Sequence, residues 1–108
     1  MKSTLLKKPL CVGLATKVLG DKWSPRLLLA LSRETVRFCM LRERVSGITP
    51  RMLSKRLTDL EQLGIIIKVV YPEVPPRSEY SLTKKGQDLL PILGAMAKWG
   101  EKYSEKRT

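Results

Sequence analysis

Residues 48–83 read ITPRMLSKRLTDLEQLGIIIKVVYPEVPPRSEYSLT, and this stretch decides the fold. Its first half predicts a helix over residues 50–63. Thr49 is a suitable N-cap, and Pro50 suits the first helical position because its fixed φ matches that of a helix. Leucines recur at helical spacing until Gly64 breaks the pattern, and this repeat indicates that one face of the helix is buried.

The second half of the stretch predicts a β-hairpin. Residues 65–71 are rich in β-branched side chains, and residues 78–82 alternate as a returning strand does. Pro72, Pro75 and Pro76 have no backbone N–H to donate, so they favour an extended loop between the two strands. We call this loop, residues 72–77, the wing.

The flanking sequence predicts further short elements. Apolar residues at helical spacing indicate three helices upstream, over residues 12–19, 25–31 and 38–45. A short strand is expected at residues 36–38. Downstream, Thr83 is expected to cap a last helix, which Pro91 should kink or restart. The order helix, helix, short strand, helix, turn, helix, hairpin, helix predicts a mostly α fold with a small β-hairpin (α+β), a winged helix-turn-helix.

Length and composition restrict the classes of function. The 108 residues, 43% of them hydrophobic, are enough for one small domain, which we expect to span residues 1–108 with a core at about 11–100. The absence of histidine excludes Ser-His-Asp and Cys-His catalysis as well as His-bound zinc. Two cysteines cannot complete a four-thiolate metal site. We therefore expect no enzyme activity, no cofactor and no metal site.

The net charge points to a polyanionic partner. Lys and Arg number 21 against 10 Asp and Glu, which leaves +11. Such an excess on a small domain favours binding to DNA, RNA or an anionic surface, although a strongly charged solvated surface is an alternative. The N-terminal apolar stretch ends at Lys17 without a cleavage site, and two cysteines do not make a secreted disulfide framework. We therefore expect a cytoplasmic protein that does not associate with a membrane.

The predicted 50–63 helix has a polar face that suits DNA. Opposite the leucines lie two cations and three hydrogen-bonding side chains, with no acidic residue among them: Arg51, Ser54, Lys55, Thr58 and Gln62. We call these five residues the polar face. Arginine donates two hydrogen bonds to guanine and glutamine pairs with adenine, while Ser, Thr and Lys bind phosphates or base edges. The alternative is an ordinary solvated helix face.

Arg77 lies at the end of the wing, where a long cation on a stiff loop suits a minor groove. Its alternative role is an ion pair with Glu73 or Glu79 across the hairpin. The candidate DNA-binding residues are Thr49, Pro50, Arg51, Ser54, Lys55, Thr58, Gln62 and Arg77.

Taken together, these segments resemble the HxlR-type winged helix-turn-helix transcriptional regulators, relatives of the MarR-like repressors. The resemblance covers about residues 11–100 and is carried by LGDKW at 19–23, ITPRML at 48–53 with Leu57, Leu60 and Gly64, YPEVPPRSEYSLT at 71–83, and LLP at 89–91 leading to Trp99-Gly100. It implies a homodimer held by the first and last helices on two-fold-symmetric operator DNA, with one recognition helix in each half-site. The apolar surplus of the last helix agrees with a dimer. Alternatively, Met96 and Trp99 close the core of a single chain.

The resemblance also makes Cys11 a candidate sensor, because some members detect aldehydes, quinones or oxidants through a cysteine just before the first helix. Lys7, Lys8 and the helix N-terminus would stabilise its thiolate. Val12 departs from the proline that usually follows this cysteine, and Asp21 replaces a glycine common before the Lys-Trp pair. Cys11 as a small buried apolar residue is the alternative. Cys39 is expected only to pack beside its apolar neighbours.

Three function classes follow from these features. The first is a dimeric, sequence-specific DNA-binding regulator, with redox or electrophile control through Cys11 as an added hypothesis. The alternative is a non-specific basic nucleic-acid-binding protein, architectural or RNA-associated, which needs the charge but reads no bases. A cysteine enzyme is disfavoured because no candidate base lies near either thiol in the sequence.

Overall fold

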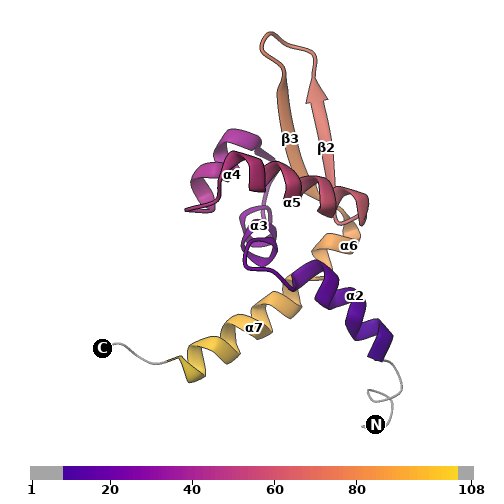
Figure 1. The fold of residues 1–108 in the computed structure, drawn as a ribbon, viewed down its shortest axis with the longest axis vertical. Coiled ribbons are helices and arrows are strands. Elements are labelled where there is room, and N and C mark those ends of the chain that lie inside the picture. Colours follow the sequence, from indigo (N-terminus) through magenta and orange to yellow (C-terminus); the bar gives the residue numbers. More distant parts are fainter. Residues whose placement is uncertain (1–8, 105–108) are drawn as a thin grey trace.

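The computed structural model describes residues 9–104, with side chains from Cys11 onward. Its elements are α2 (Pro9–Leu19), α3 (Ser24–Ala30), β1 (Val36–Arg37), α4 (Phe38–Arg44), α5 (Pro50–Gln62), β2 (Ile66–Tyr71), β3 (Arg77–Leu82), α6 (Lys84–Gln87) and α7 (Leu90–Tyr103). This order confirms the predicted winged helix-turn-helix. Figure 1 shows α5 lying across the base of a long β2–β3 hairpin, while α2 and α7 leave the body at the opposite end.

The strands form one antiparallel sheet in the order β1-β3-β2. Val36 pairs with Tyr80, and Ile66 pairs with Leu82 at the base of the hairpin. The expected strand at 36–38 is shorter by one residue, because Phe38 already begins α4. β2 lies at the edge of this sheet, with one of its two long sides unpaired by any described strand.

The ends of α5 follow the sequence signals. Thr49 Oγ1 accepts a hydrogen bond from the Met52 N–H at 3.1 Å, so Thr49 is the N-cap as predicted. The helix ends at Gln62, one residue before the predicted boundary, and Gly64 follows with a φ of +77°. A left-handed φ of this kind favours glycine, which explains why the helix stops there.

The core lies between α5, α3, α4 and the sheet. Its largest fully buried side chains include Leu27, Leu28, Leu41, Leu53, Leu57, Leu60 and Ile65. The leucine stripe of α5 is therefore buried, as its spacing predicted. In contrast, Leu29 of α3 is about half exposed, so this leucine-rich helix is not buried on all sides. The partly buried Trp23 packs against this core.

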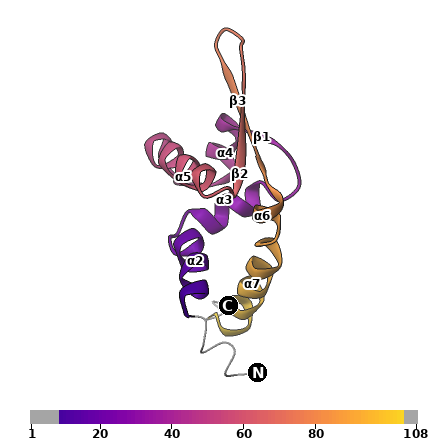
Figure 2. The ribbon, with the colours of Figure 1, turned by 90° about the vertical axis from the view of Figure 1, so that its right-hand side faces the viewer.

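Pro91 marks a restart rather than a kink. Thr83 Oγ1 accepts from the Gly86 N–H at 3.1 Å and so caps the short helix α6. The chain then turns, and α7 begins at Leu90 with Pro91 in its first turn. Figure 2 shows α2 and α7 extending away from the body on two sides of a gap between their ribbons. Within residues 9–104, no helix is long and apolar enough to cross a lipid bilayer.

Candidate nucleic-acid interface

The polar face of α5 points away from the body of the protein. All five of its side chains are exposed, whereas Leu53, Leu57 and Leu60 on the opposite side are buried. Thr49 and Pro50, at the start of the same helix, are exposed too. The structure therefore brings seven of the eight candidate DNA-binding residues together on one helix and its cap, with no other described element packed over them.

The two cations of the polar face differ in their surroundings. Lys55 Nζ lies 3.4 Å from Asp59 Oδ2, one turn further along α5. Arg51 has no ion pair with any residue in the described range 9–104. Its guanidinium is thus available to a bidentate acceptor such as the edge of a guanine or a phosphate.

A second set of ion pairs holds the flank of α5. Arg56 Nη1 lies 3.0 Å from Asp21 Oδ2, in the turn between α2 and α3, and Arg56 Nη2 also pairs with Asp59. This contact could not be predicted from local sequence patterns, because Asp21 and Arg56 are separated by 35 residues. The one feature of the sequence that pointed to it is Asp21 itself. It is an acidic residue at a position where the family that the sequence resembles commonly has glycine.

The carboxylate of Asp21 is unusually well bound. Burial disfavours its ionised form, but the Ser24 hydroxyl, the Ser24 and Trp23 N–H groups and the Arg56 guanidinium all donate to it. Together these donors outweigh the burial and lower the pKa of Asp21 from its ordinary value of 3.8.

Arg77 is held by the hairpin. Its Nη1 lies 3.3 Å from Glu73 Oε2, and its Nε lies 3.3 Å from Glu79 Oε2. The guanidinium also stacks over the Tyr71 ring, 4.2 Å from the ring centroid. The ion-pair alternative therefore describes Arg77 in this structure, with both carboxylates engaged. Val74, at the tip of the wing, is fully exposed.

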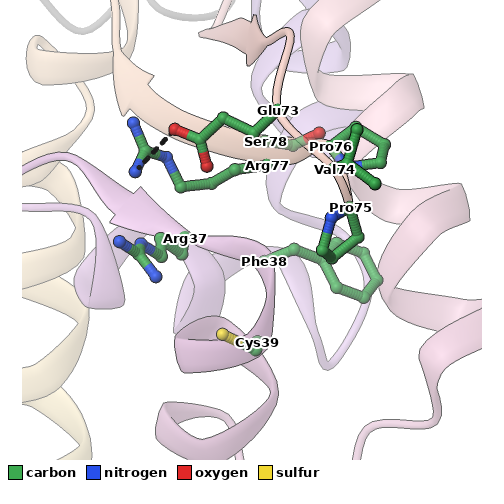
Figure 3. A pocket seen from close by; sticks show the side chains of 9 residues that line it. All are labelled: Arg37, Phe38, Cys39, Glu73, Val74, Pro75, Pro76, Arg77 and Ser78. Carbon is green, nitrogen blue, oxygen red and sulfur yellow. Dashed lines mark ion pairs between the residues drawn. The ribbon is translucent and has the colours of Figure 1, made fainter.

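A cavity of about 390 Å³ separates the wing from the start of α4. Residues 37–39 line one wall and residues 73–78 the other, as Figure 3 shows. Cys39 is exposed at this cavity, so the expectation that it packs inside is wrong. The reason is helical geometry: Leu41 occupies the buried side of α4, and Cys39 lies two residues from Leu41 and faces away from it.

Cys11 lies within the first turn of α2, because this helix already begins at Pro9. The thiol is exposed, so the alternative of a buried apolar cysteine is wrong. Beside it is a mostly apolar cavity of about 190 Å³, lined by Cys11, Leu14, Ala15, Val18, Ile65, Lys85 and Leu89. Lys7 and Lys8, expected to stabilise the thiolate, lie outside the described residues.

An apolar stripe runs along the exposed side of α7. It consists of Ile92, Met96, Trp99 and Tyr103, which recur at helical spacing. Met96 is 46% exposed and Trp99 is 68% exposed, so the alternative that both close the core of one chain is wrong. On α2, Val12 and Leu14 are also at least half exposed.

Known proteins of similar sequence are regulators with a helix-turn-helix. Residues 18–108 match the family described as HxlR-like helix-turn-helix. A helix-turn-helix transcriptional regulator of Methanothermobacter thermautotrophicus is 45% identical over 92 residues, which make up 85% of this chain and 70% of that protein.

Solved structures of regulators share the fold. A MarR-family transcriptional regulator of Porphyromonas gingivalis W83 superposes with a TM-score of 0.82 at 35% identity, covering 89% of this chain and 94% of that one. The redox regulator HypR in its oxidised form superposes with a TM-score of 0.79 at 39% identity, covering 88% of this chain and 98% of that one. With its winged helix-turn-helix and the exposed polar face of α5, the chain belongs to the HxlR-like helix-turn-helix family of transcriptional regulators.

Proposed function

We propose that this regulator acts in the cytoplasm as a homodimer on a two-fold-symmetric DNA site. In each copy α5 enters a major groove, and the wing lies on the adjacent backbone or minor groove. The observation that carries the proposal is the arrangement of α5, which buries its leucines and presents the polar face to solvent. An α-helix with exposed cations and hydrogen-bonding side chains has the size and chemistry that a major groove admits.

The side chains of the polar face differ in the DNA contacts that their chemistry allows. Arg51 is the leading candidate for base reading, since it has no intramolecular ion pair in the described chain and stands in the first turn of α5. Gln62 and Thr58 supply neutral hydrogen bonds further along the helix. Lys55 is suited to a phosphate or a base edge, and its contact with Asp59 gives its side chain a direction along the helix.

The wing contributes differently from α5. Arg77 already has two carboxylate partners, and it reaches DNA only by leaving one of them for a phosphate or for the minor groove. The net charge of the Glu73, Arg77 and Glu79 cluster is −1, so this cluster by itself attracts no polyanion. We propose that α5 brings the protein to DNA and that Arg77 is exchanged onto the DNA afterwards.

The dimer is supported by the apolar side chains left exposed on α2 and α7. One small domain rarely leaves a contiguous stripe containing Trp, Tyr, Met and Ile in water, and covering it with a second copy removes that penalty. A two-fold axis between the copies would then present the two α5 helices to two half-sites.

The central test is a titration of the protein with a two-fold-symmetric duplex selected from random DNA by the wild type, against a scrambled duplex of equal length. We expect the selected duplex to bind at least ~10³-fold tighter at physiological salt. Arg51→Ala should lose preference at one base position and about 1–3 kcal/mol of binding free energy.

Arg33→Ala is the matched control, because Arg33 is an exposed cation in the turn after α3 and the loss of charge is the same. It should leave base preference intact. Two results would identify a non-specific basic nucleic-acid-binding protein instead. One is equal affinity of the wild type for both duplexes, and the other is an affinity of Arg51→Ala that falls equally on every sequence.

We further propose that Cys11 makes DNA binding sensitive to oxidants or electrophiles. Its thiol is exposed on α2, one of the two helices assigned to the dimer, and the similar protein HypR is described as a redox regulator. Diamide or an aldehyde should change the affinity of the wild type for the selected duplex and leave Cys11→Ala unchanged. Cys39→Ala is the control and should respond like the wild type; a response that survives in Cys11→Ala removes Cys11 from the mechanism.

A further inference from the structure

Asp21 joins the turn between α2 and α3 to α5. Its Oδ1 accepts the N–H groups of Trp23 and Ser24, both at 2.8 Å. Its Oδ2 accepts the Ser24 hydroxyl at 2.7 Å and pairs with Arg56 Nη1 at 3.0 Å. Three hydrogen bonds from its own turn therefore fix the carboxylate in place, and the fixed carboxylate in turn positions the Arg56 guanidinium.

The charges continue from Arg56 to the polar face. Arg56 pairs with Asp59, and Asp59 pairs with Lys55 at 3.4 Å. Four side chains of alternating sign thus lead from the α2–α3 turn to a member of the polar face. We call Asp21, Arg56, Asp59 and Lys55 the charge chain.

Arg56 is the least exposed member of the charge chain, and Lys55 is the most exposed. The side chain of Arg56 is 19% exposed, whereas that of Lys55 is 62% exposed. Removing one partner of a shielded ion pair destabilises the structure more than removing one partner of an exposed pair, because the remaining charge is left poorly solvated. Arg56 Nε is already buried without a hydrogen-bond partner in the described chain, so the loss of Asp21 would add to the unsatisfied donors of this guanidinium.

In the charge chain, Asp59 has two cationic partners. While Asp21 holds one side of Arg56, Asp59 is divided between Arg56 and Lys55. Without the charge of Asp21, Arg56 would turn fully onto Asp59. Lys55 would then lose its partner, and α5 would lose its polar anchor to the α2–α3 turn.

We propose that Asp21 is a positioning residue for base recognition, which fixes the setting of α5 and the direction of Lys55 through Arg56 and Asp59. This inference rests on the proposed DNA-binding function of the polar face. Asp21 does not touch DNA in this proposal; it keeps the reading side chains in one arrangement and so favours the correct sequence over others.

Asp21→Asn separates the role of the charge from that of the hydrogen bonds to the turn backbone. The amide oxygen of asparagine can still accept the N–H groups of Trp23 and Ser24, whereas its NH2 group takes the place of Oδ2. That group neither accepts the Ser24 hydroxyl nor carries the charge that holds Arg56. Asp88→Asn is the matched control, since it removes the same charge from an exposed pair with Lys84 on α6. We expect the ratio of affinities for the selected and scrambled duplexes to fall about tenfold in Asp21→Asn, which is about 1.4 kcal/mol, and to stay at the wild-type value in Asp88→Asn.

A double-mutant cycle shows whether the effect passes through Arg56. If it does, Asp21→Asn combined with Arg56→Gln lowers the affinity ratio no further than Arg56→Gln alone. The inference is overturned, while the proposed function stands, if the two substitutions lower the affinity ratio additively. It is also overturned if the affinity ratio of Asp21→Asn equals that of Asp88→Asn. A wild type with no preference for the selected duplex overturns the proposed function itself, and the positioning role with it.

Discussion

Among single residues, Asp21 has the most heavily bonded carboxylate described above. Folding lowers its pKa, so the folded state favours the ionised form more than the unfolded chain does. By linkage, the stabilisation that comes from Asp21 is fully present above its ordinary pKa of 3.8. It is lost as the pH falls through the lower pKa of the folded state.

The pH dependence of Asp21→Asn tests this at neutral and acidic pH. We expect the free energy of unfolding of the wild type to exceed that of Asp21→Asn most at pH ~7, and the difference to shrink below pH ~4. The reason is that a protonated aspartate and an asparagine are both neutral. Urea denaturation at several pH values measures the difference, with Asp88→Asn as the control for the loss of an exposed carboxylate. A difference that grows in acid would contradict the assignment.

Residues of the polar face could be predicted from the sequence because helical periodicity alone places them opposite the leucines. For Arg77 the sequence reduced the possible ion-pair partners to two. For Arg56 it did not indicate the partner at all. For Arg77 both Glu73 and Glu79 were within reach, and the sequence could not decide between an ion pair and DNA. For Arg56 the partner Asp21 comes from another turn of the fold, which no local pattern specifies.

At the scale of elements, the recognition helix depends on its first turn. Thr49→Ala removes the acceptor of the Met52 N–H, and we expect it to lower the free energy of unfolding by about 1 kcal/mol. For a domain of this size that corresponds to roughly 4–8 °C in the melting temperature. Thr49→Ser should restore most of the loss, whereas Thr58→Ala, exposed on the same helix, should stay within about 0.5 kcal/mol of the wild type. Equal melting of all three variants would show that the cap is not stabilising.

The helix and the hairpin in residues 48–83 could be predicted because their start and stop signals are local. The pairing of β1 with β3 could not, since it joins segments far apart in the chain. The same holds for Gly86, where an added Cβ would lie only 2.3 Å from the Ile65 carbonyl oxygen. That close approach between α6 and the start of the hairpin depends on the packed fold.

In the molecule as a whole, the apolar stripe of α7 is the feature that one chain does not explain. We expect Met96→Ser combined with Trp99→Ser to shift the protein from dimer to monomer. Affinity for the two-fold-symmetric duplex should then fall by at least about 10²-fold, because the second half-site no longer binds as part of the same particle. Sedimentation velocity and duplex titration measure the two effects. Ala97→Ser, exposed on the same helix, is the neutral control, and a double variant that remains dimeric would place the interface elsewhere.

Sequence reasoning detected the apolar surplus of the last helix but not its position in space. Leu93 is buried in the core, whereas Trp99, six residues further along α7, is largely exposed. Which apolar residues are covered depends on where a helix leaves its neighbours, and this is a property of the assembled fold.

The open edge of β2 carries a liability for handling the protein. Its six residues, IIKVVY, include Lys68 as the single charged side chain, and Ile67, Val69 and Val70 are all exposed. Strands of this composition with unpaired backbone groups are templates for cross-chain pairing and fibrous aggregation. Lys68 is the one charge in β2 that opposes such pairing at this edge of the sheet.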